Sequence, residues 1–344
     1  MSYFVGAYAS SPNVEGWDQA LEKEYYDQLK AFKNMRGLEH PFVGQLHPHD
    51  DDWFLDNIDP AWDMVFTCVP GTMGRMAANP NFGIASDNEA GRLEAVAFIE
   101  KACKAVAKLN AFSGRQAVQA VEVQTAPNKS MAASSAKSLK TSLDTMLSWD
   151  WQGAQIVIEH CDQFVEGQTL AKGFLSLEDE IHVLTTLNSE LNNESKALGM
   201  VINWGRSAIE KRNLNGAAEH IQKVKESGLL VGLMFSGASD QSSEYGIWED
   251  THMPPSIALA DAKSEDCSLM TEAEMHRCLS LVYLKESGLK ESSAKESDVK
   301  ENGEKETSPS IVGIKLGIRP HDTSLEDRIA YNRDALSVLD RFFV

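Results

Sequence analysis

Short apolar runs alternate along the chain with longer stretches in which apolar residues recur every three to four positions. This alternation is typical of β-strands that are each followed by an amphipathic helix in a parallel α/β fold. Several runs are continuously apolar, which indicates strands buried on both faces. The pattern predicts eight strands, at residues 3–8, 37–43, 64–69, 118–125, 154–159, 198–203, 229–235 and 311–316.

The stretches between and after these strands predict helices at residues 17–32, 91–110, 134–148, 177–192, 217–227, 271–284 and 325–342. Eight strands alternating with helices predict a single (β/α)8 TIM barrel, in one domain over residues 1–344, with long loops at its C-terminal mouth. Two connections fit this alternation poorly. Residues 69–91 are rich in Gly and Pro and are expected to form a loop over the mouth, and residues 44–62 are rich in His, Asp and Trp.

A low-complexity segment interrupts the chain before the last predicted strand. Residues 285–309 consist of five pentads that each begin with Lys-Glu and contain few apolar residues. Because such a composition buries almost no apolar surface, we expect a disordered insertion here. The alternatives are a continuation of the preceding helix through Lys and Glu pairs and use of the segment for docking.

Composition and charge narrow the class of protein. The 344 residues are 42% hydrophobic and 24% charged, as in a soluble globular protein. Lys and Arg number 32 against 51 Asp and Glu, and the formal charge of −19 repels phosphate groups, so no nucleic acid and no membrane is expected as a partner. The five cysteines are scattered without a CxxC motif, which favours neither a disulfide framework nor a zinc knuckle and indicates a cytoplasmic protein. The oligomeric state stays open.

The fifth predicted strand supplies the first candidates for chemistry, because the reactive groups of a TIM barrel lie at the carboxyl ends of its strands. The charged residues Glu159, His160 and Asp162 follow a buried run, so each must reach the rim or be paired inside. Glu159 is the first catalytic candidate, with a rim salt bridge as its structural alternative. His160 is a candidate substrate contact or proton-transfer partner.

The last predicted strand contains Lys315, which needs an anion nearby. A cross-barrel pair with Glu159 is one possibility. In the functional interpretation, Lys315 anchors the substrate or acts as an amine with a lowered pKa. Arg319 follows directly and suits bidentate capture of a carboxylate or phosphate, or a clamp on the preceding loop.

Further polar residues interrupt the other predicted strands. Together with Glu159, Lys315 and Arg319 they predict a polar, substrate-binding ring at one mouth, to which Glu39, Glu122, Asn203 and Arg206 belong. Ser236 begins a Ser-Gly-Ala-Ser turn that is a candidate to bind an anion through its backbone amides, with a bare turn as the alternative.

Two loops add candidates. Asp250 and His252 lie two residues apart in a loop that ends in two prolines, and His252 is a candidate catalytic acid or base. The loop from His47 to Trp53 has the composition of a metal cluster, although an Asp-rich turn that caps a helix is the commoner interpretation.

Five short motifs of the chain stand out together: Val5-Gly-Ala-Tyr-Ala-Ser, Gly37-Leu-Glu39, Ile158-Glu159-His160, Phe235-Ser-Gly-Ala-Ser and Asp250-Thr-His252-Met-Pro-Pro. They resemble an uncharacterised, function-unassigned branch of the xylose isomerase-like TIM barrels, the superfamily of sugar and sugar-phosphate isomerases and epimerases. The resemblance spans most of the chain outside the Lys-Glu pentads. It implies a (β/α)8 barrel and an isomerase or epimerase activity.

The resemblance also implies a metal site that this chain departs from. Isomerases of the superfamily usually hold one divalent metal with a Glu, an Asp, a His and a Glu at the ends of strands five to eight. Only Glu159 matches, because the other places hold Asn203, Phe235 with Ser236, and Lys315. A lysine so close would repel a metal ion, so we expect no metal cofactor. An altered set of Glu159 with His252 and Asp250 or His160 is the alternative.

These observations predict a sugar isomerase/epimerase-like enzyme that acts on a small sugar or sugar acid by proton transfer next to a carbonyl. Glu159 would be the base or acid, His252 or His160 its partner, and Lys315 with Arg319 the electrophilic and anion-holding groups. One alternative is a lyase or aldolase that uses Lys315 as a Schiff-base amine. The other is a barrel without catalysis that binds a sugar or a partner protein.

Overall fold

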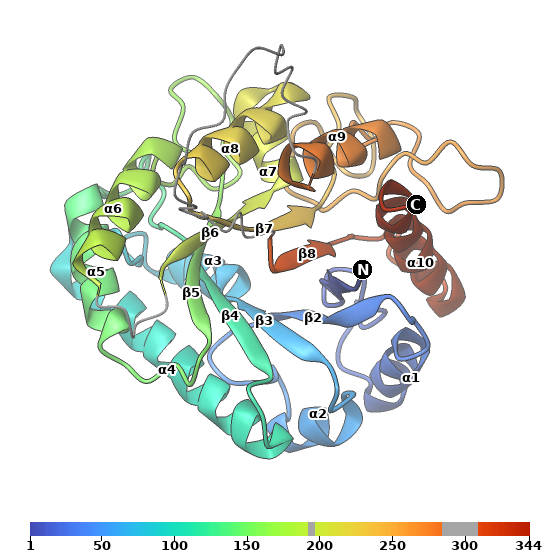
Figure 1. Cartoon of the computed structure of the whole chain (residues 1–344), viewed down its shortest axis with the longest axis horizontal. Helices are drawn as coiled ribbons and strands as arrows, with labels where there is room; N and C mark the ends of the chain where they lie inside the picture. Colours follow the sequence, from blue (N-terminus) through green and yellow to red (C-terminus); the bar gives the residue numbers. More distant parts are fainter. Residues whose placement is uncertain (192–196, 284–308) are drawn as a thin grey trace, which may run out of the picture.

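The strands form a closed barrel in a computed structural model that describes residues 1–191, 197–283 and 309–344. Within these ranges each strand pairs in parallel with the next in chain order, and the last pairs with the first (Figure 1). The predicted (β/α)8 barrel is therefore confirmed. The strands are β1 (Tyr3–Val5), β2 (Met35–Pro41), β3 (Asp63–Thr67), β4 (Val118–Val123), β5 (Gln155–His160), β6 (Gly199–Asn203), β7 (Leu230–Phe235) and β8 (Ile311–Ile314).

Helices surround the barrel, as Figure 1 shows. Several begin at a short polar side chain that accepts a hydrogen bond from a backbone N–H of the first turn, as Asp18, Asn88, Ser135, Ser176 and Ser324 do. The helices are α1 (Gln19–Leu29), α2 (Asp51–Asn57), α3 (Val69–Ala78), α4 (Glu89–Ser113), α5 (Ala136–Leu147), α6 (Leu177–Glu190), α7 (Trp204–Lys211), α8 (Asn215–Glu226), α9 (Glu272–Tyr283) and α10 (Leu325–Phe342).

The expected loop over residues 69–91 is wrong in its first half, which forms α3. Pro70 stands in the first turn of this helix, where its missing N–H is not needed. Gly71 lets the helix approach α4, since an added Cβ there would lie 2.5 Å from Cζ of Phe98. Two of the residues that suggested a loop, Pro70 and Gly71, thus serve helix entry and close packing.

Two further short helices lie in places where the sequence predicts none. Asp50 caps α2 by accepting hydrogen bonds from the N–H groups of Asp52 and Trp53, so the Asp-rich turn follows its commoner interpretation. Helix α7 begins directly after β6, because Asn203 ends the strand and caps the helix at once.

The barrel interior changes from apolar to polar toward the carboxyl ends of the strands. Side chains alternate between the two faces of a strand, so residues two positions apart point the same way. One interior cluster is apolar and comprises Phe4, Val65, Ala120, Val157, Val201, Met234 and Ile311. Two residues further along the same strands lie Gly6, Thr67, Glu122, Glu159, Asn203, Ser236 and Gly313.

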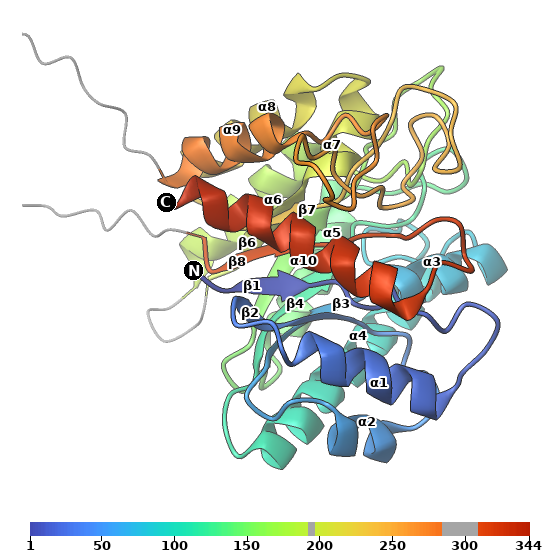
Figure 2. The same cartoon turned by 90° about the vertical axis from the view of Figure 1, so that its right-hand side faces the viewer.

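Long connections gather at the mouth formed by these carboxyl ends. Figure 2 shows the loop between β7 and α9 on the side of the barrel away from the N-terminus. The predicted insertion at residues 285–309 lies, except for Pro309, outside the described residues. Among the helices of the described ranges, none is long and apolar enough to cross a membrane.

Candidate active site

Lys315, directly after β8, forms the centre of a buried charge cluster at the barrel mouth. Its Nζ lies 2.5 Å from Oε1 of Glu39 on β2 and 3.1 Å from Oε1 of Glu159 on β5. All three side chains are fully buried. Gly6 leaves room for this pair, because a Cβ there would lie 2.8 Å from Oε2 of Glu39 and 3.0 Å from Cγ of Lys315. The predicted cross-barrel pair of Lys315 and Glu159 is confirmed, and Glu39 completes it.

Glu159 is held by side chains from helix α7 and from other strands of the barrel. Nη1 of Arg206 lies 2.6 Å from its Oε2, and Gln124 donates to the same oxygen at 3.1 Å. Asn203 donates to Oε1 at 3.3 Å. Burial alone would raise the pKa of Glu159, but the charges of Arg206 and Lys315 hold it well below the ordinary value. Glu159 is therefore a carboxylate and a weak base.

The other two mouth carboxyl groups behave differently. Burial, together with the charges of Glu159 and Glu39, raises the pKa of Glu122 well above its usual value, so Glu122 retains its proton. Burial also raises the pKa of Glu39, although Lys315 opposes the shift. Glu39 already pairs with Lys315, and a proton on Glu122 supplies a hydrogen-bond donor toward Glu39. Three carboxyl groups within one cluster thus have different affinities for a proton.

Arg206 links this cluster to the loop after β7. Its Nε donates to Oδ2 of Asp250 at 3.1 Å, and Nζ of Lys172 donates to the same oxygen at 2.9 Å. His252 lies with Nδ1 2.8 Å from Oγ of Ser236 and 3.3 Å from Oδ1 of Asp250. Burial lowers the pKa of His252 to about 3 despite the Asp250 charge, so its imidazole is neutral near pH 7.

A divalent metal does not fit this mouth. Oxygen atoms of Glu39, Glu122 and Glu159 lie within 4.8 Å of one another, a spacing that a cation can occupy. However, the Lys315 ammonium already contacts two of these carboxylates and Arg206 contacts one. A metal ion among these oxygens would lie a few Å from two fixed positive charges in a buried site.

The alternative ligand set of Glu159 with His252 and Asp250 or His160 is not assembled. His160 follows Glu159 on the strand and therefore faces the opposite side of the sheet. Its nitrogens lie 2.6 Å from Glu180 and 3.1 Å from Glu210, outside the barrel interior. Asp250 is already paired with two cations.

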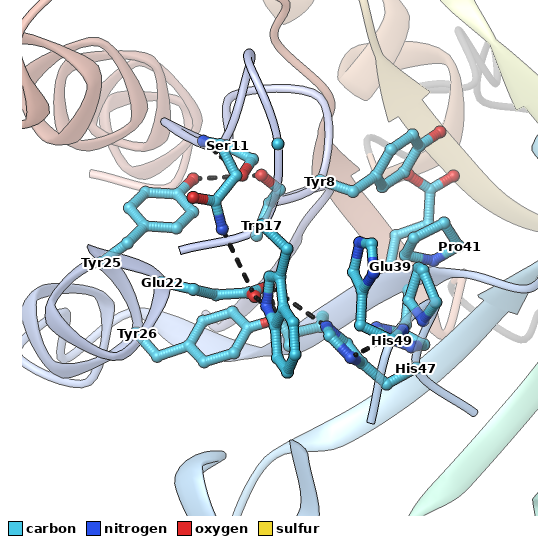
Figure 3. A pocket seen from close by; sticks show the side chains of 16 residues that line it. Tyr8, Ser11, Trp17, Glu22, Tyr25, Tyr26, Glu39, Pro41, His47 and His49 are labelled. Atoms are coloured by element: carbon cyan, nitrogen blue, oxygen red, sulfur yellow. Dashed lines mark hydrogen bonds and ion pairs between the residues drawn. The ribbon is translucent and has the colours of Figure 1, made fainter. Parts of the chain in front are cut away.

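A cavity of about 240 Å³ leads to Glu39 from the side of β1 and β2. Figure 3 shows Tyr8 and Glu39 at one end and Tyr25 and Tyr26 at the opposite end. The volume lies just below the range usual for pockets that hold drug-sized ligands, so the occupant has to be small. The cavity is lined by Ala7, Tyr8, Ser11, Asn13, Gly16, Trp17, Glu22, Tyr25, Tyr26, Leu38, Glu39, His40, Pro41, His47, Pro48 and His49.

One wall of the cavity is an aromatic and ionic cluster. The Trp17 ring stacks on His49, with centroids 4.8 Å apart and planes inclined by 8°. Trp17 Nε1 donates to Glu22 at 2.5 Å, and His47 Nε2 lies 3.5 Å from the other oxygen of Glu22. Burial alone would raise the pKa of Glu22, but the hydrogen bonds from His47, Trp17 and Tyr26 lower it. The wall thus offers a flat ring beside an ionised carboxylate.

The structure gathers most of the site residues that the sequence predicts. Glu39, Glu122, Glu159, Asn203, Arg206 and Lys315 form one buried cluster, and Asp250, His252 and Ser236 join it through Arg206. Two residues lie elsewhere. His160 faces the surrounding helices, and Arg319 lies 6.0 Å from the Tyr245 ring while its N–H donates to Tyr245 Oη. Arg319 therefore holds the loop after β7, as in the clamp that the sequence offered as an alternative to anion binding.

Other residues at the site were missed. Gln124 follows Glu122 by two positions, and Thr67 ends β3, so strand alternation would have placed both at the mouth. Lys172, Trp17 and Glu22 lie in a loop or a helix, and each meets a residue of another loop. No local pattern marks them, because only the closure of the barrel brings them to the mouth.

His40 gives the stability of the fold a pH dependence. Burial lowers the pKa of this imidazole to about 4, and its Nε2 lies 2.5 Å from the Leu46 carbonyl oxygen. The unfolded chain binds the proton near pH 6.5, so stability present above that pH is lost as the pH falls toward 4. We expect this residue to contribute a loss of about 3 kcal/mol in the free energy of unfolding.

Urea unfolding at pH 7 and pH 4.5 measures this contribution. His40→Gln should lose less stability on acidification than the unaltered protein, whereas His182→Gln, at an exposed position on α6, should match it. Equal pH dependence in all three proteins would show that His40 does not carry the effect.

Solved structures share this fold at low sequence identity. A D-tagatose 3-epimerase-like protein superposes with a TM-score of 0.55 at 12% identity, covering 100% of this chain and 97% of that one. A xylose isomerase-like TIM barrel/4-hydroxyphenylpyruvate dioxygenase fusion protein gives 0.53 at 12% identity, covering 98% of this chain and 42% of that one. These matches confirm that the chain shares the fold of xylose isomerase-like barrels.

Sequence comparison finds a relative of higher identity than these solved structures. The chain is 34% identical over 254 residues to "Uncharacterized protein STM3670" of Salmonella typhimurium (strain LT2), covering 73% of this chain and 78% of that protein. Residues 4–302 match the family described as Domain of unknown function (DUF4862). That match spans β1 to β7 and all the mouth residues before Lys315. The chain therefore belongs to the DUF4862 family.

Proposed function

We propose that this protein is an isomerase or epimerase that moves a proton next to the carbonyl group of a small sugar or sugar acid. The observation that carries the proposal is the Lys315 ammonium, which pairs with Glu159 and with Glu39, the member of this cluster that lines a small cavity. A fixed positive charge beside a carboxylate matches what enolate formation requires. The carboxylate takes the proton from carbon, and the ammonium stabilises the oxygen that becomes negative.

Lys315 is suited to this electrostatic role. Burial alone would lower its pKa, but the charges of Glu159 and Glu39 raise it well above the ordinary value. The side chain therefore stays an ammonium group and lacks the lone pair that a Schiff base needs. The charged state of Lys315 therefore favours proton transfer over the lyase or aldolase alternative.

Glu39 is the base we assign to the reaction. It lines the cavity, and its raised pKa brings it nearer to neutral pH, where a general base is most effective. Glu159 is held ionised by Arg206 and Lys315 and serves to position both cations. The proton that Glu39 takes from one carbon is returned by Glu39 to the neighbouring carbon, and His252, neutral and 2.8 Å from Ser236, is a candidate hydrogen-bond partner of the substrate.

The cavity supports a polyhydroxylated substrate. Aromatic rings offer apolar faces to the C–H faces of a sugar, and Trp17 borders the cavity beside the polar groups of Glu22 and His47. The shared fold with a D-tagatose 3-epimerase-like protein supports the same class of substrate. The cavity volume of about 240 Å³ restricts the substrate to a small molecule, so a monosaccharide or its acid fits better than an oligosaccharide.

Solvent exchange tests the proposal before any product is identified. The protein is incubated in D2O with separate ketoses, aldoses and sugar acids, and ¹H NMR follows loss of the signal at the carbon next to the carbonyl. We expect protein-dependent exchange with at least one compound. Ligands that raise the melting temperature without exchange would instead support a binding barrel, and borohydride-trapped adducts on Lys315 would support the aldolase alternative.

A further inference from the structure

A second buried polar cluster lies outside the barrel, between β5 and the helices α7 and α8. His160 comes from β5, Glu210 from α7 and His220 from α8, and all three are at most 3% exposed. None of them contributes to the mouth described above. Buried imidazole and carboxylate groups are costly unless each polar atom has a partner, so the cluster requires an explanation of its own.

The spacing of the side-chain atoms suits one metal ion. Glu210 Oε2 lies 3.1 Å from His160 Nε2, and Glu210 Oε1 lies 3.3 Å from His220 Nε2. One ligand atom from each residue can be chosen so that all lie within 4.8 Å of one another. Ligands about 2.0–2.1 Å from a tetrahedral zinc ion are separated from each other by about 3.3 Å.

The hydrogen bonding of His220 is incomplete without such an ion. Its Nδ1 lies 3.0 Å from Ser207 Oγ, which accounts for one ring nitrogen. Its Nε2 and Glu210 Oε1 are both buried, and neither takes part in an aligned hydrogen bond despite their 3.3 Å separation. Lys211 Nζ lies 3.5 Å from that oxygen, on a side chain that is partly exposed, and it does not contact His220 Nε2 among the described residues.

His160 is oriented as metal-binding histidines usually are. Its Nδ1 lies 2.6 Å from Glu180 Oε2, and Thr125 donates to the other oxygen of Glu180 at 2.6 Å. A carboxylate behind one ring nitrogen fixes the ring and directs the other nitrogen at the ion. Glu210 Oε2 is likewise fixed by the N–H of Gln163 at 3.0 Å.

We propose that His160, Glu210 and His220 bind one divalent transition metal ion of the zinc type. Two imidazoles and one carboxylate form a ligand set that zinc takes in proteins. The ion would join β5, one residue from Glu159, to α7, which carries Arg206 four residues before Glu210. Its role is to hold Arg206 against Glu159, so these three residues are positioning residues for the mouth and do not touch the substrate.

Metal content and cobalt spectroscopy test this site. The full chain is stripped with a chelator, loaded with Co²⁺ and freed of excess metal by gel filtration. We expect about one Co²⁺ per chain, with the intense visible bands of tetrahedral coordination and a higher melting temperature than the stripped protein has. His220→Gln should weaken Co²⁺ binding at least tenfold, as the loss of one of three ligands requires.

Two control variants separate this site from the mouth and from adventitious binding. Glu122→Gln alters the mouth carboxylates, and His276→Gln alters a half-buried histidine on α9, so both should keep full metal content. Metal lost in Glu122→Gln but kept in His220→Gln would overturn the proposal. So would a wild-type protein that holds no metal after loading.

X-ray absorption of the zinc-loaded wild-type protein keeps the test decisive if His220→Gln does not fold. Two imidazole ligands at about 2.0–2.1 Å are expected. A coordination shell of oxygen atoms alone would overturn the proposal. Neither readout depends on knowing the substrate, so failure of this site leaves the proposed proton transfer at the mouth unaffected.

Discussion

Lys315→Met is expected to lower the free energy of unfolding by about 3–5 kcal/mol, the usual cost of removing one partner from a buried ion pair. Its Nζ lies 2.5 Å from Glu39 and 3.1 Å from Glu159, and all three side chains are fully buried. Without the ammonium, Glu39 has no cationic partner and faces Glu159 and Glu122 in the same cluster. Guanidinium unfolding at pH 7 measures the difference from the unaltered protein.

The pH dependence of this loss identifies its cause. With Lys315 gone, the pKa of Glu39 in the folded protein should rise further, so the folded state binds a proton more readily than the unfolded chain does. Stability of the variant relative to the unaltered protein should therefore recover as the pH falls from 7 toward 5. A loss that stays constant with pH would indicate lost packing of the side-chain methylenes instead.

Lys172→Met is the matched control for this substitution. Lys172 pairs with Asp250, but Asp250 keeps Arg206 as a second cationic partner. We expect the control to cost about 1 kcal/mol, close to the value for a partly exposed pair. Equal losses in the two variants would contradict the central position that we assign to Lys315.

Glu39→Gln is expected to slow the exchange of substrate protons with D2O by a factor of about 10²–10⁴, the usual contribution of a general base. The amide keeps the size of the side chain but cannot accept a proton from carbon. Lys315 retains Glu159 as its ion-pair partner in this variant, so the protein should remain folded. The exchange rate is measured by ¹H NMR with the compound that reacts fastest in the panel.

Glu122→Gln is the control for the catalytic substitution. Glu122 already retains its proton, because burial and two neighbouring carboxylates raise its pKa. A neutral amide therefore reproduces its charge, and we expect the exchange rate to stay within about tenfold. If Glu39→Gln exchanges as fast as the unaltered protein, the base is another residue, and Glu159→Gln and His252→Gln become the next variants.

The two proposals place neighbouring residues of one strand in different roles. Glu159 faces the barrel interior and holds Lys315 and Arg206, whereas His160 faces the helices and meets Glu210. Arg206 and Glu210 share α7, so the cluster of His160, Glu210 and His220 holds the helix that carries Arg206. Loss of this cluster should therefore move Arg206 and slow the exchange of substrate protons at the mouth, without changing which group takes the proton.

Much of the fold follows from periodicity in the sequence. Each observed strand overlaps a predicted one, since strands buried on both faces form apolar runs that no amphipathic helix resembles. Helices α2, α3 and α7 were missed for local reasons. Two are short, and α3 contains Pro70 and Gly71, which suggest a loop but serve helix entry and packing against Phe98.

The site was predictable in part. Polar residues at the ends of buried strands marked Glu39, Glu122, Glu159 and Lys315, because charge in such a run needs a partner or a task. The same alternation, applied strictly, would have placed His160 on the opposite face from Glu159. The sequence thus identified most of the inward-facing residues and the pair of Lys315 with Glu159, but not Glu39 as the third member of that cluster.

By itself, the sequence determined the barrel and the strand ends that carry charge, because both depend on residue order and side-chain alternation within single elements. Only the tertiary structure decided which charges meet. The closed barrel brings residues 39, 159 and 315 into contact, keeps the proton on Glu122 and places Trp17 and Glu22 beside Glu39. Those outcomes depend on distance and burial, and both are set when segments far apart in the chain pack together.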